Sequence, residues 1–242
     1  MFSKIDPKLN DAINIASNWL DYISYSRRIP SVSLGIIFGT RLVYSENFGF
    51  SDVEKRKKSS CDTAYRIASI SKTFTAVAIF QLAEKRLLSL DDPVVKHLEW
   101  FKSDSDNNLE HITIRQILCH ASGLARETDC NCFLDDKFPD AEHIKKYISK
   151  NPTIFSPYEI WKYSNLGYCI LGLLIEQVSG KSYEEYITEH IIRKLNMSRT
   201  WPNFSEKLKS YLAKGYSNDV PNKKRKPFCK GRIFFNIRMT NK

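Results

Sequence analysis

No run of apolar residues in this chain approaches the roughly 18 needed to cross a bilayer, so the sequence predicts no membrane span. The N-terminus is polar and lacks the charged start, apolar stretch and small-residue cleavage site of a secretory signal, so we expect a cytoplasmic protein. Glycine and proline are scarce, at nine each among 242 residues, while aromatic residues make up 12%. This composition argues against disorder and favours one sizeable core, or one domain with a lobe inserted into it.

The six cysteines lack the arrangement of a metal site. Cys130 and Cys132 are separated by one residue, but no second Cys or His pair stands at the spacing typical of zinc. Without an export signal, reduced thiols are the default state. We therefore expect neither a metal nor a cofactor.

The positive charge of the chain is confined to its end. Residues 207–242 hold eleven Lys or Arg and one acidic residue, which accounts for the whole net charge of +10. We therefore divide the chain into a folded domain over 1–206 and a basic C-terminal segment over 207–242. A basic run such as Lys223-Lys224-Arg225-Lys226 is usually a solvated chain end, so no nucleic-acid partner is expected. Steeply salt-dependent DNA binding that is lost on deleting 222–242 would favour the opposite interpretation.

After a first helix, the strands come before the remaining helices, without the alternation of a parallel sheet. The apolar spacing predicts strands over 32–38 and 41–50 and helices over 7–27, 69–86, 141–149, 166–179 and 182–195. Gly39-Thr40 joins the two strands as an antiparallel hairpin, and Thr113 caps a further helix that ends at Ser122-Gly123. We expect an α+β fold, with an antiparallel sheet flanked by helices and a helical lobe near 85–200.

The clearest chemical signal is a serine one helical turn before a lysine. Ser69 and Lys72 stand at the start of the helix predicted over 69–86, which is apolar nearly all round and is expected to be buried. A serine hydroxyl needs a base, and a lysine serves as one when burial and nearby dipoles lower its pKa. The spacing alone is weak, because a solvated lysine at a helix start has the same pattern.

A second signal lies directly before the helix predicted over 166–179. In Tyr163-Ser164-Asn165, the phenol can relay a proton beside a lysine and the amide can hold both lysine and substrate. Taken alone, the tripeptide fits equally well as an ordinary helix N-cap at Asn165 with Tyr163 packed beside it. Two similar tripeptides, Tyr216-Ser217-Asn218 and Ser105-Asp106-Asn107, lie in polar segments and are discounted.

Three segments together resemble class C β-lactamases and the related DD-peptidases and esterases. Residues 66–98, RIASISKTFTAVAIFQLAEKRLLSLDDPVVKHL, look like the nucleophile helix of that family and its exit. Residues 111–124, HITIRQILCHASGL, are similar to its I-T-I-R-x-L-L-x-H-x-S-G-L block, and residues 161–200 look like its Tyr-x-Asn region. The resemblance covers roughly residues 30–216 in one order, and it implies a β-lactamase/transpeptidase-like fold.

The resemblance also implies a role for each matching residue. Ser69 would form the acyl-enzyme, and Lys72 would be its proton partner. Tyr163 would act as general base or relay, and Asn165 would position Lys72 and the substrate. The backbone N–H of Ser69 would supply half of an oxyanion hole, whereas His120 is expected to be a structural turn residue.

The sequence also departs from the family pattern. The family carries a Lys- or His-x-Gly motif on a late strand, but no glycine after Asn165 has Lys or His two residues before it. Pro157-Tyr158 stands where the family usually has Pro-Gly, and residues 222–242 resemble no family segment. We therefore expect an incomplete member that lacks the late sheet strands, is weakly stable and has little activity.

Two functions consequently stay open. One is a serine hydrolase or acyltransferase that acts through acyl-Ser69 on an amide, ester or β-lactam, with a small-molecule or peptide substrate. The other is a catalytically inactive remnant, or an interaction protein, with the same half-fold. The missing motif favours the second function, while the presence of Ser69, Lys72, Tyr163 and Asn165 together favours the first.

Overall fold

The structure, a computed structural model, describes residues 7–129, 139–204, 206–216, 227–228 and 234–235. Cys130, Cys132, Cys229 and the basic run 223–226 lie outside these ranges. The described helices and antiparallel strands confirm the predicted α+β class, and none of these helices is long and apolar enough to span a membrane. The chain divides into two compact units, one formed by residues 1–68 with 196–242 and the other by residues 69–195.

The first unit is built on the predicted hairpin. Strand β1 (Ser31–Phe38) pairs antiparallel with β2 (Arg41–Asp52), and β3 (Lys57–Lys58) pairs with the other edge of β2. Gly39 turns the chain between β1 and β2 with a φ of 62°, a left-handed conformation that glycine adopts without a steric penalty.

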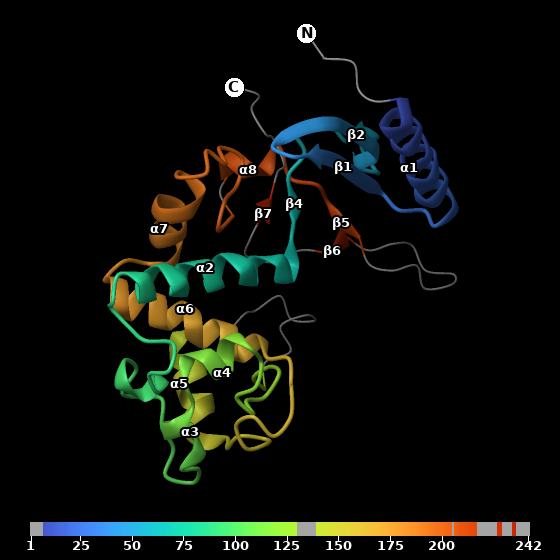
Figure 1. Cartoon of the computed structure of the whole chain (residues 1–242). Helices are drawn as coiled ribbons and strands as arrows, with labels where there is room; N and C mark the ends of the chain where they lie inside the picture. Colours follow the sequence, from blue (N-terminus) through green and yellow to red (C-terminus); the bar gives the residue numbers. More distant parts are fainter. Residues whose placement is uncertain (1–6, 130–138, 205, 217–226, 229–233, 236–242) are drawn as a thin grey trace. The chain divides into compact units, whose positions relative to one another are not determined.

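Helix α1 (Pro7–Ser26) lies beside this hairpin, as Figure 1 shows. Its buried face carries Ile13, and the Ser17 hydroxyl donates to the Glu46 carboxylate of β2 at 2.5 Å. The opposite face leaves Trp19 and Tyr22 exposed. The prediction of a helix that ends before Pro30 is confirmed.

The remaining elements of the first unit are short. They are β4 (Tyr65–Arg66), α8 (Glu206–Lys209), β5 (Gly215–Tyr216), β6 (Pro227–Phe228) and β7 (Phe234–Phe235). Strand β4 pairs with β7 and β5 pairs with β6, both antiparallel. Ala64 and Leu208 are fully buried and form a small core with Trp201 and Leu212 around them.

The second unit is organised around two helices that run side by side in Figure 1, α2 (Ser71–Glu84) and α6 (Asn165–Ser179). Helix α6 ends at Gly180, whose φ of 67° allows the backbone to leave the helix. The two helices bury a shared set of apolar side chains, which removes their surface from water. These are Phe74, Ala78, Ile79 and Leu82 of α2 and Leu166, Ile170, Leu171, Leu174 and Ile175 of α6.

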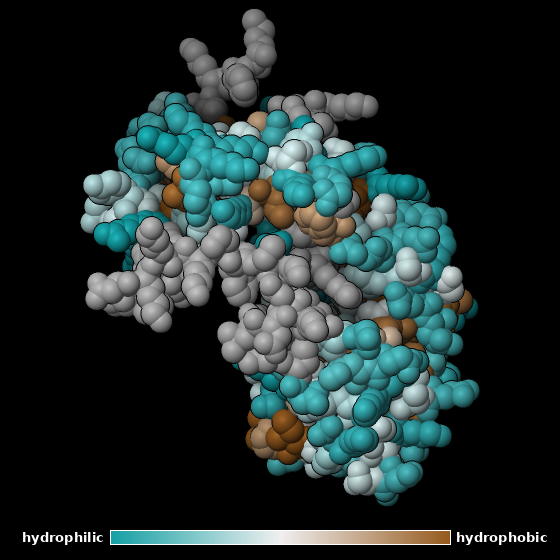
Figure 2. Space-filling model, turned by 180° about the vertical axis from the view of Figure 1, so that it is seen from behind, coloured by the Kyte–Doolittle hydropathy of each residue, from teal (hydrophilic) through white to brown (hydrophobic). Residues whose placement is uncertain are grey.

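The start and the burial of α2 differ from the prediction. A 3-10 turn over Ala68–Ile70 precedes the α-helix, so Ser69 lies on that turn and not on the helix itself. Val77 and Phe80 are 46% and 55% exposed, so the expectation of a helix buried on every side is wrong. Hydropathy records that a face is apolar but not whether another element covers it. The face seen in Figure 2 is mostly hydrophilic, with its hydrophobic residues in separate small patches.

The helical lobe completes the second unit. It comprises a 3-10 turn at Val94–Lys96, then α3 (Asn108–His111), α4 (Ile114–Leu118) and α5 (Ala141–Lys150). Thr113 caps α4 as predicted, in a capping box with Gln116. The helix ends at Leu118, earlier than predicted, because the chain turns through His120 with a φ of 60°.

The helix predicted over 182–195 is interrupted in the structure. Helix α7 (Tyr183–Ile187) begins with a capping box between Ser182 and Glu185, and a π-helical turn at Thr188–Ile192 follows it. A π turn keeps the apolar residues on the buried side, so periodicity in the sequence does not distinguish it from a regular helix.

Candidate active site

Ser69 lies on the 3-10 turn that leads into α2 and is exposed to solvent. The residue before it, Ala68, has a φ of 45°, a left-handed conformation that costs a non-glycine residue energy. Ile70 occupies the N-cap position of α2 and offers no side-chain bond to the first helical N–H groups. The serine hydroxyl is therefore presented at a helix N-terminus whose backbone N–H groups no N-cap side chain satisfies.

The side chain of Tyr163 reaches Ser69 across 94 residues of sequence. Its phenol donates a hydrogen bond to Ser69 Oγ at 2.7 Å. The Lys72 ammonium lies 4.7 Å from the centre of the same phenol ring. Serine, lysine and tyrosine therefore share one small region at the start of α2.

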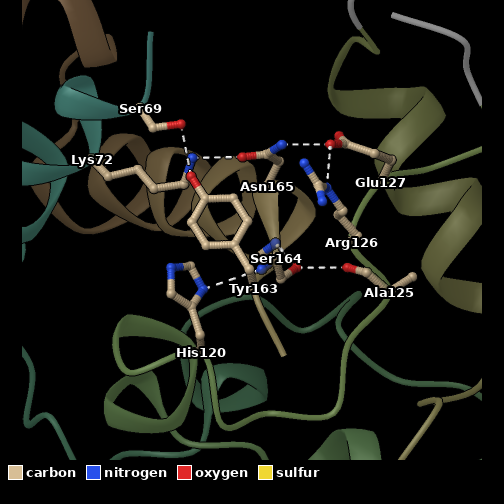
Figure 3. Close-up of polar contacts among 10 residues, drawn as sticks. Ser69, Lys72, His120, Ala125, Arg126, Glu127, Tyr163, Ser164 and Asn165 are labelled. Atoms are coloured by element: carbon tan, nitrogen blue, oxygen red, sulfur yellow. Dashed lines mark hydrogen bonds and ion pairs between the residues drawn. The ribbon is translucent and has the colours of Figure 1, made fainter. Parts of the chain in front are cut away.

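Asn165 completes the group that the sequence predicted. Lys72 Nζ donates to Asn165 Oδ1 at 2.6 Å, and Lys72 is half-buried beside this contact. The structure brings together all four predicted site residues, Ser69, Lys72, Tyr163 and Asn165, as Figure 3 shows. They all belong to the second unit.

The surroundings of Tyr163 favour its ionised form. Desolvation raises the pKa of its phenol, but hydrogen bonds with Lys72 and Ser69 and the charges of Lys72 and Arg126 outweigh that effect, so the net pKa lies below its ordinary value. The guanidinium of Arg126 lies 5.8 Å from the ring centre. A phenolate held at hydrogen-bond distance from a serine hydroxyl can accept its proton.

The start of α6 shows why Asn165 is available for this contact. The N-cap is Ser164, not Asn165: its hydroxyl accepts from the N–H of Gly167 at 2.8 Å and donates to the carbonyl of Ala125 at 2.6 Å. Because Ser164 takes the capping role, the Asn165 side chain is free to bind Lys72. The competing prediction, an Asn165 N-cap, is wrong.

His120 supports Tyr163 from below the ring in Figure 3. His120 Nδ1 accepts from the backbone N–H of Ser164 at 3.2 Å. The centres of the His120 and Tyr163 rings lie 4.5 Å apart. Burial and the nearby Lys72 charge lower the pKa of the imidazole, which favours the neutral ring that this acceptor role needs. The contact agrees with the structural role expected for His120.

Two charged residues of the site were missed in the sequence. Glu127 accepts a hydrogen bond from Asn165 Nδ2, and Arg126 lies near the Tyr163 ring. Both belong to a segment without regular periodicity, which the sequence presents only as a polar loop. The adjacent Ser-Gly-Leu of residues 122–124 could have drawn attention to them, but nothing in the sequence places them beside α6.

The two discounted tripeptides have other contacts. The Asp106 carboxylate accepts from the Thr153 N–H at 2.6 Å and hydroxyl at 2.9 Å, and so ties two loops of the lobe together. The Tyr216 phenol donates to Glu54 at 2.5 Å within the first unit. Ser217 and Asn218 lie outside the described residues.

Tyr158 is the residue at which the sequence departs from the Pro-Gly of the family pattern. It stands where a glycine is usual, and its φ is 66°, in the left-handed region that favours glycine. Its N–H donates to the carbonyl of Ala121 at 2.8 Å, which holds this turn against the loop that carries His120. The tyrosine therefore keeps the turn at a steric cost.

Within the part of the chain that the structure describes, no group of three or more His, Cys, Asp or Glu side chains could hold a metal ion. The described site consists of hydroxyl, amine, amide, imidazole, carboxylate and guanidinium groups. Groups of these kinds can take part in proton transfer and nucleophilic attack.

Both the sequence and the fold of this chain are similar to those of known proteins. The model of the family described as Beta-lactamase matches residues 11–233, a range that extends beyond residue 206. The structure is similar to that of the octameric penicillin-binding protein homologue from Pyrococcus abyssi, with a TM-score of 0.77 and 30% identity. That similarity covers 93% of this chain and 53% of the homologue.

Two relatives show the same level of similarity in sequence. Protein flp of Staphylococcus aureus (strain MW2) is 32% identical over 191 residues, which cover 79% of this chain and 38% of the relative. Beta-lactamase-like protein 2 of Dictyostelium discoideum is 32% identical over 216 residues, which cover 87% of this chain and 39% of the relative. The chain thus spans well under half the length of either relative.

Proposed function

This chain belongs to the beta-lactamase family, and from that premise we propose that it is a serine hydrolase or acyltransferase that works through an acyl-Ser69 intermediate. Its substrate would be an amide, ester or β-lactam. The observation that carries the proposal is the 2.7 Å hydrogen bond between Tyr163 and Ser69, formed beside the Lys72 ammonium.

The first step is acylation. The Tyr163 phenolate accepts the proton of the Ser69 hydroxyl as Oγ attacks the carbonyl carbon, and a new C–O bond forms. The tetrahedral adduct collapses as the bond to the leaving nitrogen or oxygen breaks. The leaving atom takes from Tyr163 the proton that came from Ser69, so the phenolate is restored and the acyl group stays on Ser69.

The second step releases the acyl group. Water, or another acceptor with a hydroxyl or amine, gives a proton to Tyr163 as it attacks the acyl carbon and forms a new bond. The bond between that carbon and Ser69 Oγ then breaks, Oγ takes the proton from Tyr163, and the acyl group leaves on the acceptor. Lys72 keeps its ammonium against the phenol ring and makes the phenolate less costly in both steps. Asn165 holds Lys72 in that place through its side-chain carbonyl.

The backbone also contributes charge stabilisation in this proposal. The Ser69 N–H belongs to the turn that opens α2, where peptide dipoles point their positive ends toward the reacting oxygen. Exposure of Ser69 gives the substrate access to the nucleophile. The described residues support the reaction class more specifically than they support one substrate.

Burst kinetics with a chromogenic nitrophenyl ester test the proposal. The wild-type protein should release one equivalent of nitrophenol per chain rapidly, followed by slower turnover, because we expect the acyl-enzyme to form faster than it is hydrolysed. Ser69→Ala should abolish the burst, whereas Ser71→Ala, a matched change two residues along, should retain it. A burst that survives in Ser69→Ala would contradict the proposal.

A chromogenic β-lactam used in the same assay distinguishes the substrate classes. Turnover of the ester alone would favour an esterase, and turnover of both would favour a broader acyl-transfer enzyme. If the folded wild-type protein reacts with neither probe, the alternative of a non-catalytic protein with the same fold is favoured.

A further inference from the structure

The Asn165 amide is held at both of its ends. Its Oδ1 accepts from Lys72 Nζ at 2.6 Å, and its Nδ2 donates to Glu127 Oε1 at 2.5 Å. We propose that Glu127 is a positioning residue that fixes the orientation of Asn165 and, through it, the place of Lys72. This inference rests on the proposed function, and it adds a residue to which neither motif pointed.

The chemistry of the three groups permits only one arrangement. An ammonium can only donate hydrogen bonds and an ionised carboxylate can only accept them, whereas an amide has one end of each kind. With Glu127 on one side and Lys72 on the other, the amide must turn its nitrogen to the carboxylate and its oxygen to the ammonium. A flipped amide would face an N–H group toward the ammonium and its oxygen toward the carboxylate.

Among the described residues, Glu127 is the hydrogen-bond acceptor on the nitrogen side of the amide, so its loss removes the group that selects this orientation there. Asn165 could then rotate about its terminal torsion, which is broad for amide side chains. Lys72 would lose a fixed acceptor and with it a fixed distance to the phenol ring. Hydrogen bonds to charged groups are among the stronger ones in proteins, so the carboxylate is a well-suited anchor.

The backbone around Glu127 is itself attached to the start of α6. The carbonyl of Arg126 accepts from the N–H groups of Asn165 at 2.8 Å and Leu166 at 3.1 Å, and the carbonyl of Ala125 accepts from the Ser164 hydroxyl at 2.6 Å. Figure 3 shows the segment passing directly beside Asn165. The Glu127 carboxylate is therefore carried by a segment whose backbone is hydrogen-bonded to the start of α6.

The side chain of Glu127 is also partly withdrawn from solvent. It is 29% exposed, compared with 65% for the neighbouring Arg126, whose Nε lies 3.7 Å from Glu127 Oε1. The Tyr163 phenol bonds Ser69, whereas Glu127 bonds Asn165, so the action of Glu127 on the reaction passes through Asn165. It is a positioning residue and not a catalytic one.

Side-chain amide NMR tests the contact without requiring activity. The Asn165 amide signal is assigned by its loss in Asn165→Asp, and its proton exchange with water is then measured. Exchange should accelerate about tenfold or more in Glu127→Ala, and less in Glu127→Gln, whose carbonyl can still accept. Glu142→Gln, which changes an 81% exposed carboxylate on α5, should leave it unchanged. Equal exchange in the wild type and Glu127→Ala would overturn the inference.

The acylation rate of Ser69 tests the consequence. Glu127→Ala should slow the burst about 10- to 100-fold, because a misplaced supporting group costs roughly this much. The melting temperature should fall by only about 2–4 °C, as expected for one lost hydrogen bond. Glu127→Gln should recover much of the rate. A burst in Glu127→Ala equal to that of the wild type overturns the inference. A folded wild-type protein that reacts with neither the ester nor the β-lactam instead refutes the proposed function, and the amide signal still decides whether Glu127 holds Asn165.

Discussion

Helices α2 and α6 both begin at the site, but their first turns are built differently. The start of α2 has no side-chain cap, follows a left-handed Ala68 and leaves Ser69 exposed. The start of α6 has the buried Ser164 as its cap, and the carbonyls of Ala125 and Arg126 accept hydrogen bonds from Ser164, Asn165 and Leu166. The nucleophile is thus carried, with Lys72, by the less braced end, and Tyr163 and Asn165 are carried by the more braced one.

This difference suits the chemistry that we propose. A nucleophile must reach its substrate and change its bonding, whereas a base and its supporting amide must keep their distances. Interactions that brace α6 should therefore affect both stability and rate. Changes at the corresponding position of α2 should affect stability little.

The largest expected effect follows from removing the group that joins the two helix ends. Tyr163→Phe deletes the hydroxyl that bonds Ser69, and the acylation rate should fall about 10²- to 10⁴-fold because general-base catalysis is lost. Rapid-mixing burst kinetics measure this rate. Tyr22→Phe, which makes the same change on the exposed face of α1, is the control, and a Tyr163→Phe rate within twofold of it would break the comparison.

A smaller effect is expected when the caps themselves are compared. Ser164→Ala removes a buried cap and its bond to Ala125, and should lower the free energy of unfolding by about 1–3 kcal/mol. Ile70→Ala, at the N-cap position of α2, should change it by less than about 0.5 kcal/mol. Urea denaturation of both variants gives these values. Equal losses would mean that the two helix starts are braced alike.

The two glycines of α6 sharpen the same point. Gly167 lies in the first turn of α6, where an added Cβ would lie 2.9 Å from Ile117 Cγ2 of α4. An added Cβ at Gly172, further along the helix, would meet nothing closer than Tyr183 Cδ2 at 3.8 Å. Gly167→Ala should therefore destabilise the protein by about 1–2 kcal/mol through overpacking. Gly172→Ala should stabilise it by up to about 1 kcal/mol through helix propensity. Thermal unfolding that ranks them in the reverse order would show that the first turn is not tightly packed.

The smallest expected effect is electrostatic. Lys72 and Arg126 favour the Tyr163 phenolate, so the acid limb of the pH–rate profile should lie below the ordinary pKa of tyrosine. Arg126→Gln removes one positive charge, which raises the pKa of Tyr163 and should move that limb to higher pH. Added salt should reduce the difference, because the Arg126 side chain is 65% exposed. Arg193→Gln, at the exposed arginine that follows the π-helical turn, serves as the control. A limb that does not move in Arg126→Gln would exclude this charge from the site.

Local signals in the sequence predicted much of this architecture. Pro30, Gly180 and the Thr113 cap act within a few residues of where they stand, so the elements that they bound were predictable. The Ser69–Lys72 spacing and the Tyr163–Asn165 pair were recognisable because each lies at the start of an apolar helix. Their mutual contact follows from the packing of α2 against α6, which only the resemblance to a family implied.

Other features depend on tertiary contacts that leave no periodic pattern. Ser164 and Asn165 are both good N-cap residues, and the choice between them is decided by Lys72 and Ala125, which are distant in sequence. Glu127 acquires its role only because its loop lies beside α6. The exposed face of α2 was mispredicted for the same reason, since hydropathy does not reveal which neighbour covers a helix. The division of the chain at residue 206 stays a prediction.

Mass spectrometric mapping of a covalent label tests the central claim most directly. After brief exposure of the folded protein to a fluorophosphonate, digestion should place one adduct on the Ser69 hydroxyl, with no adduct on Ser71, and labelling should be much slower in Tyr163→Phe. An adduct on another residue, or equal labelling of Ser69 with and without the Tyr163 hydroxyl, would contradict an active site formed where α2 and α6 begin.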